Sequence, residues 1–327
     1  MYIARLIRPD TPLYHRLREK VKQLDSFFQI KPVIFFPVWI MSVAGVSAAE
    51  GVKTPNLIWL SNIDGTGVLF FLGLTLLIIA SLMTKNNSGE EIPVSLLKFD
   101  RTMITAIGFL LVFVISGVVS FQNTSIYPVL SLIWALGIYF LFKGGFHLRE
   151  SDEKVSLSKS ALLYAVLGIC LFMFGWNYAG GSLFTGLLHS IPYGLGYSAI
   201  GLIASLRTST VTNETTPDQK IPYSHIGAHG IVGTAFIIIA VFLGYRFGDP
   251  VISTSAIISL PFFLVLLIKP RMDHLDRTNY YPILILAIFV VVRYPWFLLP
   301  LLMLFHFCRF YYYFRYQVVY PTFSTHR

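Results

Sequence analysis

The sequence carries few charged residues, and this scarcity excludes an ordinary water-soluble domain. Charged residues make up 13% of the 327 residues and hydrophobic residues 55%, whereas soluble domains carry roughly 25% charged residues. A soluble chain of this length could not bury so much apolar surface in one core, but the hydrocarbon of a bilayer accommodates it. We therefore expect a multi-pass α-helical membrane protein.

Cysteines and familiar catalytic motifs are also scarce. The two cysteines, Cys170 and Cys308, fall inside apolar runs, and no CxxC or Cys/His spacing suggests a metal site. We expect both cysteines to be small buried hydrophobic residues. The sequence has no P-loop, no GxGxxG fingerprint and no Ser/His/Asp arrangement. Its first 25 residues lack the apolar core of a secretory signal.

Apolar stretches bounded by charged or turn residues predict nine membrane-spanning helices. The predicted spans are 30–49, 66–83, 103–120, 125–142, 159–178, 183–205, 226–245, 251–268 and 281–308. The last stretch is long, but two helices within it would each be too short to cross a bilayer. We therefore expect Pro295 and Pro300 to kink one helix rather than to divide it.

The basic residues predict how these spans are oriented. With the amino terminus in the cytoplasm, 19 lysines and arginines fall on the cytoplasmic side and five on the other. The net charge of +9 is then explained by anionic lipid rather than by nucleic acid. We expect a bacterial inner membrane or an equivalent membrane. The expected organisation is a basic amphipathic segment over 1–29, a transmembrane domain over 30–308 and an aromatic, basic interfacial tail over 309–327.

Long polar connections gather on the predicted cytoplasmic side. The segment after the second span reads TKNNSGEEIPVSLLKFD, and the one after the sixth reads SLRTSTVTNETTPDQKIPYSHIG. Both pass through a run of Asn, Thr and acidic residues and enter the next helix near a proline, as related halves of one fold would. This layout favours a site that opens to the cytoplasm, although long loops also tolerate insertions without a function.

The rhythm of the helices and these two segments resemble the UbiA-type intramembrane prenyltransferases. FFQIKPVIFFPVWIMSVAGV resembles the first helix of that family, and DQKIPYSHIGAHGIVG resembles the stretch after its second Asp motif. The matching positions in the latter are Ile221, Pro222, Tyr223, Ile226 and Gly227. The resemblance implies an all-α, UbiA-like bundle of about nine transmembrane helices. It also implies two Asp-rich motifs at the cytoplasmic mouth, where Mg²⁺ holds the diphosphate of a polyprenyl donor.

The chain departs from the family at both Asp motifs. Asparagine and glutamate replace the first two aspartates of motif one, and its third position falls on Val94 or is lost to a deletion. The second motif is not acidic in the expected register. The basic residues expected after Tyr178 are absent. The candidate polar mouth consists of Asn86, Asn87, Glu90, Glu91, Ser209, Asn213, Glu214 and Asp218. Glu90, Glu214 and Asp218 are the possible metal ligands; the alternative is that they are solvated loop charges.

Other polar residues fall in or beside the spans. The candidate contacts to a substrate or lipid are Lys85, Arg207, Tyr178, His189 and Arg293. His189 is expected either to form hydrogen bonds within the bundle or to contact a ligand, and Arg293, inside the last span, to need an anionic partner, a carbonyl or a lipid phosphate. Trp176 and Asn177, with Tyr178, are expected to anchor their span at the membrane interface.

Three functions stay open from the sequence. The first is a UbiA-like protein that transfers a polyprenyl group from its diphosphate to an acceptor in the bilayer. The second is a non-catalytic relative that binds an isoprenoid or other lipid, or serves as an assembly partner. The third is a small-solute transporter. In each case the expected partner is membrane lipid or isoprenoid.

Overall fold

The structure is a computed structural model that describes residues 34–53, 65–82, 101–145, 157–210, 223–316, 318–319 and 324–325. The helices are α4 (Phe35–Lys53), α5 (Gly65–Leu82), α6 (Arg101–Gln122), α7 (Tyr127–Gly145), α8 (Leu157–Tyr178), α9 (Leu183–Thr210), α10 (Tyr223–Arg246), α11 (Pro250–Ile268), α12 (Met272–Arg293), η3 (Pro295–Phe297) and α13 (Leu298–Tyr316). Two short strands, β1 (Val318–Val319) and β2 (Ser324–Thr325), pair antiparallel.

These helices confirm a multi-pass α-helical membrane protein. Eight helices in the described part of the chain are long and apolar enough to cross a bilayer. Two shorter apolar helices accompany them, within α4 and α7. The first eight predicted spans agree with helices α4 to α11 to within a few residues at most ends.

The prediction of one kinked helix over 281–308 is wrong. The chain breaks at Tyr294, whose φ of −127° and ψ of 78° are not helical, and Pro295 begins the short helix η3. The residue before a proline is disfavoured in the helical region, which explains a break at this point. Both helices are nevertheless long, because α12 begins in the polar run at Met272 and α13 continues to Tyr316, through residues expected to be an interfacial tail.

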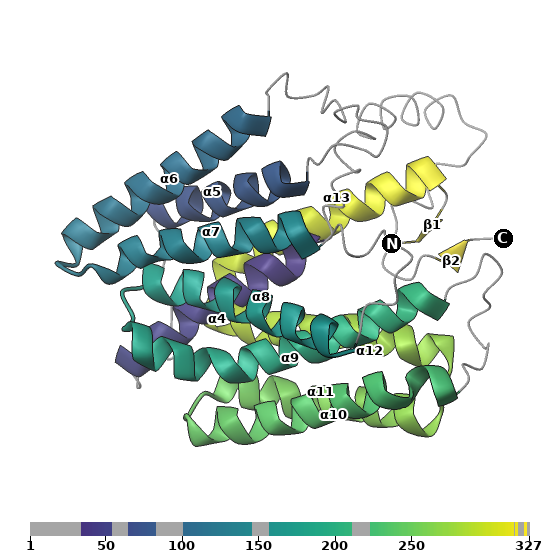
Figure 1. The fold of residues 1–327 in the computed structure, drawn as a ribbon. Helices are drawn as coiled ribbons and strands as arrows, with labels where there is room; N and C mark the ends of the chain where they lie inside the picture. The colour runs from purple at the N-terminus through teal and green to yellow at the C-terminus, as the bar shows by residue number, and fades with distance from the viewer. Residues whose placement is uncertain are drawn as a thin grey trace.

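Successive helices run in opposite directions, so their ends gather at two ends of the bundle (Figure 1). We name one of them the Asp249 end. It holds the described connections 123–126, 179–182, 247–249 and 294–297. At this end the Thr66 hydroxyl at the start of α5 lies 3.3 Å from the Tyr178 hydroxyl at the end of α8. The opposite end, which includes residues 269–271, we name the Lys269 end.

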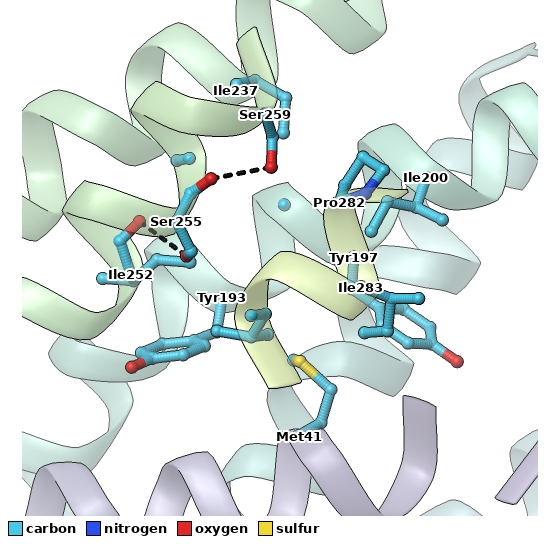
Figure 2. Close-up of a pocket in the computed structure, with 13 residues that line it drawn as sticks. Met41, Tyr193, Tyr197, Ile200, Ile237, Ile252, Ser255, Ser259, Pro282 and Ile283 are labelled. Carbon is cyan, nitrogen blue, oxygen red and sulfur yellow. Dashed lines mark hydrogen bonds between the residues drawn. The ribbon is translucent and has the colours of Figure 1, made fainter. Parts of the chain in front are cut away.

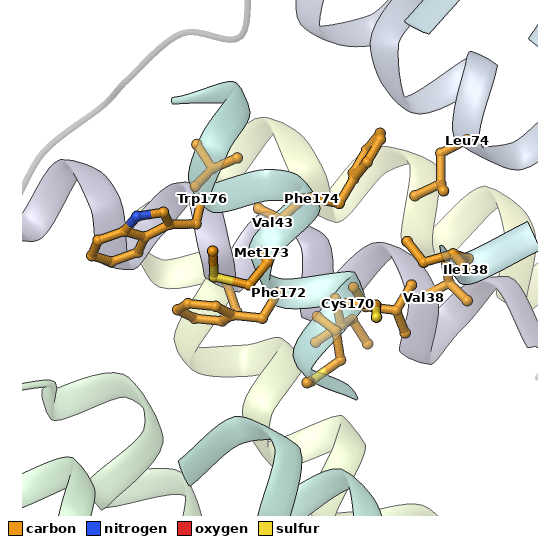
Figure 3. Close-up of a cluster of buried hydrophobic side chains, with 14 of the residues drawn as sticks. Val38, Val43, Leu74, Ile138, Cys170, Phe172, Met173, Phe174 and Trp176 are labelled. Carbon is orange, nitrogen blue, oxygen red and sulfur yellow. The ribbon is translucent and has the colours of Figure 1, made fainter. Parts of the chain in front are cut away.

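Helices α4 and α8 form the centre of the bundle. Residues 40–49 of α4 are all buried, and so are residues 170–177 of α8. Side chains of α8 point to several sides at once, toward α4, α5 and α7 (Figure 3). A helix that is apolar on every face is expected to be surrounded by other helices. The first apolar segment is therefore an inner helix rather than a peripheral one.

Two glycines allow α4 and α8 to approach backbone to backbone. A Cβ atom added at Gly45 would overlap the carbonyl of Phe172, and one added at Gly175 would overlap the carbonyl of Ser42. The two contacts are reciprocal, because each glycine meets the backbone of the other helix. Small residues at helix interfaces serve this purpose in membranes, where lipid is as apolar as leucine and close packing replaces the hydrophobic effect.

A second core lies among α9, α10, α11 and α12, where Ala199, Ile203, Phe263 and Leu275 are buried. Ser198 of α9 donates a hydrogen bond of 2.8 Å to the carbonyl of Ala161 in α8. Helix α9 thus joins the central pair to the second core.

Gly175→Ala is expected to lower the thermal stability of the purified protein, because the added methyl group has no space beside the Ser42 carbonyl. Overpacking of this kind costs roughly 1–3 kcal/mol. Gly117→Ala is the matched control, since a Cβ there meets nothing within 4 Å. Thermal unfolding in detergent measures both, and equal unfolding temperatures would contradict the proposed contact.

Candidate functional site

The described residues place a buried pair of polar side chains at the Asp249 end. The Tyr193 hydroxyl, on the first half of α9, donates a hydrogen bond of 3.0 Å to Asp249 Oδ2. Tyr193 is 1% exposed and Asp249 8% exposed. The Tyr193 ring packs against Phe172 of α8, with the ring centres 4.5 Å apart. The pair therefore lies against the central helices.

The local sequence Gly248-Asp249-Pro250 explains how the carboxylate reaches this position. Gly248 has a φ of +69° and ends α10, with hydrogen bonds from the Gly248 amide to the Tyr245 carbonyl and from the Asp249 amide to the Gly244 carbonyl. This is a Schellman motif, which favours glycine at that place. Asp249 then caps α11, since its Oδ1 accepts from the amides of residues 251 and 252 at 3.0 and 3.4 Å.

Burial raises the pKa of the Asp249 carboxyl above its ordinary value of 3.8. The hydrogen bonds from Tyr193 and from the two amides of α11, together with His189, lower the same pKa but do not outweigh burial. Removing a carboxylate from water disfavours its charged form, so the neutral acid is favoured at this site.

His189 lies near Asp249 on the same side of α9. Its ring stacks on Trp176 at 5.3 Å and packs against Phe247 at 5.4 Å. Its Nδ1 atom is shielded from water and has no hydrogen-bond partner among the described residues. The predicted hydrogen bonding of His189 within the bundle is thus not seen at Nδ1; contacts with aromatic rings hold the side chain.

The expected anchoring of Trp176 and Asn177 at the membrane interface is wrong, since both are at most 1% exposed. Trp176 Nε1 donates to the Ser182 carbonyl at 2.9 Å. The Trp176 ring packs directly on Gly181, where a Cβ atom would overlap it. Asn177 Oδ1 accepts from Trp134 Nε1 at 2.6 Å. Tyr178 stacks on Phe70, with the ring centres 4.2 Å apart. These residues join α8 to its neighbours.

The sequence predicted Arg293 inside the last span. Arg293 is the last residue of α12 and of the candidate span Met272–Arg293, so it lies at the end of a span. Its neighbour Tyr294 is fully buried and donates a hydrogen bond of 2.5 Å to Glu50 Oε2, near the end of α4. The Arg293 guanidinium lies over Gly51, which belongs to α4 as Glu50 does. Helix C-termini favour positive charge, so this place is less costly than the middle of a bilayer.

A small cavity lies between α4, α9, α10, α11 and α12 (Figure 2). Its volume is about 30 Å³, enough for about two water-sized groups. Polar atoms reach its wall mainly from α11, where the Ser255 and Ser259 hydroxyls each donate to a carbonyl of their own helix, at 3.1 and 2.7 Å. The other wall residues are Met41, Tyr193, Gly196, Tyr197, Ile200, Ile237, Ile252, Ala256, Pro282, Ile283 and Leu286.

Most of the predicted polar mouth falls outside the described residues. This applies to Asn86, Asn87, Glu90, Glu91, Asn213, Glu214 and Asp218, and also to Lys85, the predicted contact to substrate or lipid. Arg207 and Ser209 lie in the last turn of α9, at the Lys269 end, and their side chains are not among those described. Within the described ranges no group of three His, Cys, Asp or Glu side chains could hold a metal ion.

Both cysteines are buried, as predicted, at 6% and 0% exposure. The sequence-based reasoning missed Tyr193, Asp249, Glu50 and Tyr294. Gly-Asp-Pro at the start of an apolar run is a helix-capping signal and could have identified Asp249. Nothing in the sequence pairs Tyr193 or Tyr294 with its carboxylate, because the partners are 56 and 244 residues apart.

Comparisons of the chain with models of protein families, with curated proteins and with solved structures found no match in any of the three.

The raised pKa of Asp249 gives a pH-dependent stability. The stabilising contribution of the neutral acid is complete below the ordinary pKa of 3.8 and is lost as the pH rises through the higher pKa of the folded protein. Asp249→Asn keeps one of the two acceptor oxygens and cannot ionise, and the loss of the second acceptor is the same at every pH. We expect the unfolding temperature of this variant to rise relative to the original protein as the pH increases from about 4 to about 8.

Thermal unfolding in detergent over that pH range tests this expectation. Asp273→Asn is the control, because Asp273 is exposed and pairs with Arg277 at 2.8 Å on the surface of α12. A difference between Asp249→Asn and the original protein that does not change with pH would contradict the assignment.

Proposed function

We propose that this chain is a UbiA-like integral membrane protein whose bundle binds an isoprenoid or similarly branched lipid chain. The cavity between α4, α9, α10, α11 and α12 carries the proposal. Its wall is almost entirely apolar, and the Ser255 and Ser259 hydroxyls direct their hydrogens to carbonyls of their own helix. Such a wall suits methyl-branched hydrocarbon and offers little to a diphosphate.

The size of the cavity restricts what part of a lipid it accepts. About two water-sized groups fit, which suits the branched end of a chain rather than its whole length. Tyr197 and Ile200 of α9 and Ile283 of α12 are only half-buried, and they lie together on one side of the cavity (Figure 2). The remainder of the chain is proposed to leave on this side, between α9 and α12, toward the bilayer.

Transfer of the polyprenyl group from its diphosphate is the reaction proposed for an active member of this type. It would depend on the carboxylates of Glu90, Glu214 and Asp218, which lie outside the described residues and belong to segments predicted from the basic residues to be cytoplasmic. Binding of the hydrocarbon chain does not depend on those carboxylates. The two parts of the proposal can therefore be tested separately.

The transporter hypothesis receives less support. It was based on His189 and Arg293, and both lie at the Asp249 end rather than along a path across the bundle.

Gly196→Leu is expected to reduce the isoprenoid that co-purifies with the protein by about tenfold, a loss of about 1.4 kcal/mol of binding free energy. Gly196 lines the cavity, and a Cβ there meets only Ile252 Cδ1, at 3.9 Å, so the larger side chain can fill the cavity without disturbing the backbone. Mass spectrometry of extracted lipids provides the measurement. Gly117→Leu, on an open face of α6, is the control. No isoprenoid in the original protein, or equal amounts in both variants, would refute the binding site.

The double variant Glu90→Ala with Glu214→Ala distinguishes transfer from binding alone. An active transferase is expected to consume a polyprenyl diphosphate in the presence of Mg²⁺ and to lose this activity in the double variant. A binding protein is expected to retain isoprenoid without consuming the diphosphate and to be indifferent to a chelator. Product formation is followed by mass spectrometry of the lipid fraction.

A further inference from the structure

The Arg293 guanidinium packs against Gly51 of α4 and forms no ion pair among the described residues. A Cβ built on Gly51 would lie 3.0 Å from Nη2 and 3.1 Å from Nη1 of Arg293, so the guanidinium is in close contact with the backbone of α4. The neighbouring carboxylate of Glu50 accepts its hydrogen bond from Tyr294 instead. No residue of the described ranges forms a hydrogen bond or ion pair with Arg293. A half-buried guanidinium in this state has its donors available to a ligand.

The surface beside Arg293 is apolar and open. Ile288 and Val292, one turn apart on α12, are 60% and 63% exposed, and Leu299 at the start of α13 is 62% exposed. In a membrane protein such side chains contact acyl chains. The guanidinium lies where α12 ends, at the level at which a helix leaves the hydrocarbon for the headgroups. A cation at the end of a helix that exposes apolar side chains in its last turns matches the two parts of a phospholipid.

We propose that Arg293 binds the phosphate group of a phospholipid whose acyl chains lie along Ile288, Val292 and Leu299. The planar guanidinium matches two phosphate oxygens at once, and the hydrogen bonds are charge-assisted. Tyr294 contributes indirectly, because its hydroxyl holds the Glu50 carboxylate, which would otherwise compete for Arg293. Free phosphate would gain the ion pair but not the apolar contact, so a lipid is the favoured occupant. This inference does not depend on the isoprenoid proposal.

Native mass spectrometry of the purified full chain, with phosphatidylglycerol added to the detergent, tests the proposal. We expect Arg293→Gln to weaken binding of one phosphatidylglycerol by about tenfold or more, as loss of a charge-assisted pair should. Arg246→Gln is the matched control, since Arg246 is an exposed arginine that ends α10 at the same end of the bundle. It is expected to leave this binding unchanged.

Two further ligands separate the lipid from its parts. A galactolipid with the same acyl chains lacks phosphate and is expected to bind the original protein and Arg293→Gln equally. Inorganic phosphate is expected not to displace the phospholipid. Displacement by inorganic phosphate, or unchanged phosphatidylglycerol binding in Arg293→Gln, would overturn the proposal. Unfolding temperatures without added lipid identify any variant that fails to fold; Arg293→Lys then replaces Arg293→Gln, with weaker binding expected because the amine lacks the two-pronged geometry.

Discussion

The contact between α4 and α8 at Gly45 and Gly175 constrains the rest of the bundle. In lipid, association of helices depends on close packing, and backbones approach this closely only where neither residue has a side chain. The approach buries ten consecutive residues of α4. With α4 enclosed, α8 can contact α7 through the Ser131 hydroxyl, which donates to the Phe174 carbonyl at 3.2 Å. The outer helices then take positions around this central pair.

The same packing decides where polar groups can be tolerated. At the Asp249 end, Tyr193 supplies a hydroxyl to Asp249, and Tyr294 supplies one to Glu50. Each carboxylate thus accepts a hydrogen bond from a phenol. A neutral partner also does little to offset the burial that raises the pKa of Asp249. Asp249 therefore stabilises this end less as the pH rises through its pKa.

Hydropathy predicted the positions of most helices of this chain but not of all. It located α4 to α11 because their charged and turn residues lie between the helices. It failed over α12 and α13 for two reasons. Helix α12 begins with MDHLDRTNYY, whose polar residues conceal its first turns, and α13 ends with FCRFYYYFRY, which has the composition of an interfacial tail.

The division at Tyr294 also changes the predicted arrangement of charge. Helix α13 ends at the same end of the bundle as α4 begins, which brings Arg309 to the Lys269 end. Of the basic residues placed in described helices and turns, only Lys53, Arg246 and Arg293 belong to the Asp249 end. The orientation remains a prediction, but the charge bias that supports it becomes sharper with the added helix.

Composition and hydropathy alone determined that this chain is a multi-pass helical membrane protein. Charged residues are costly in hydrocarbon, so they are rare within the spans and gather between them. Only the tertiary structure paired Tyr193 with Asp249 and Tyr294 with Glu50, and placed Arg293 over Gly51. These contacts join residues far apart in the chain, and their geometry follows from how closely particular helices pack, which no local pattern of residues records.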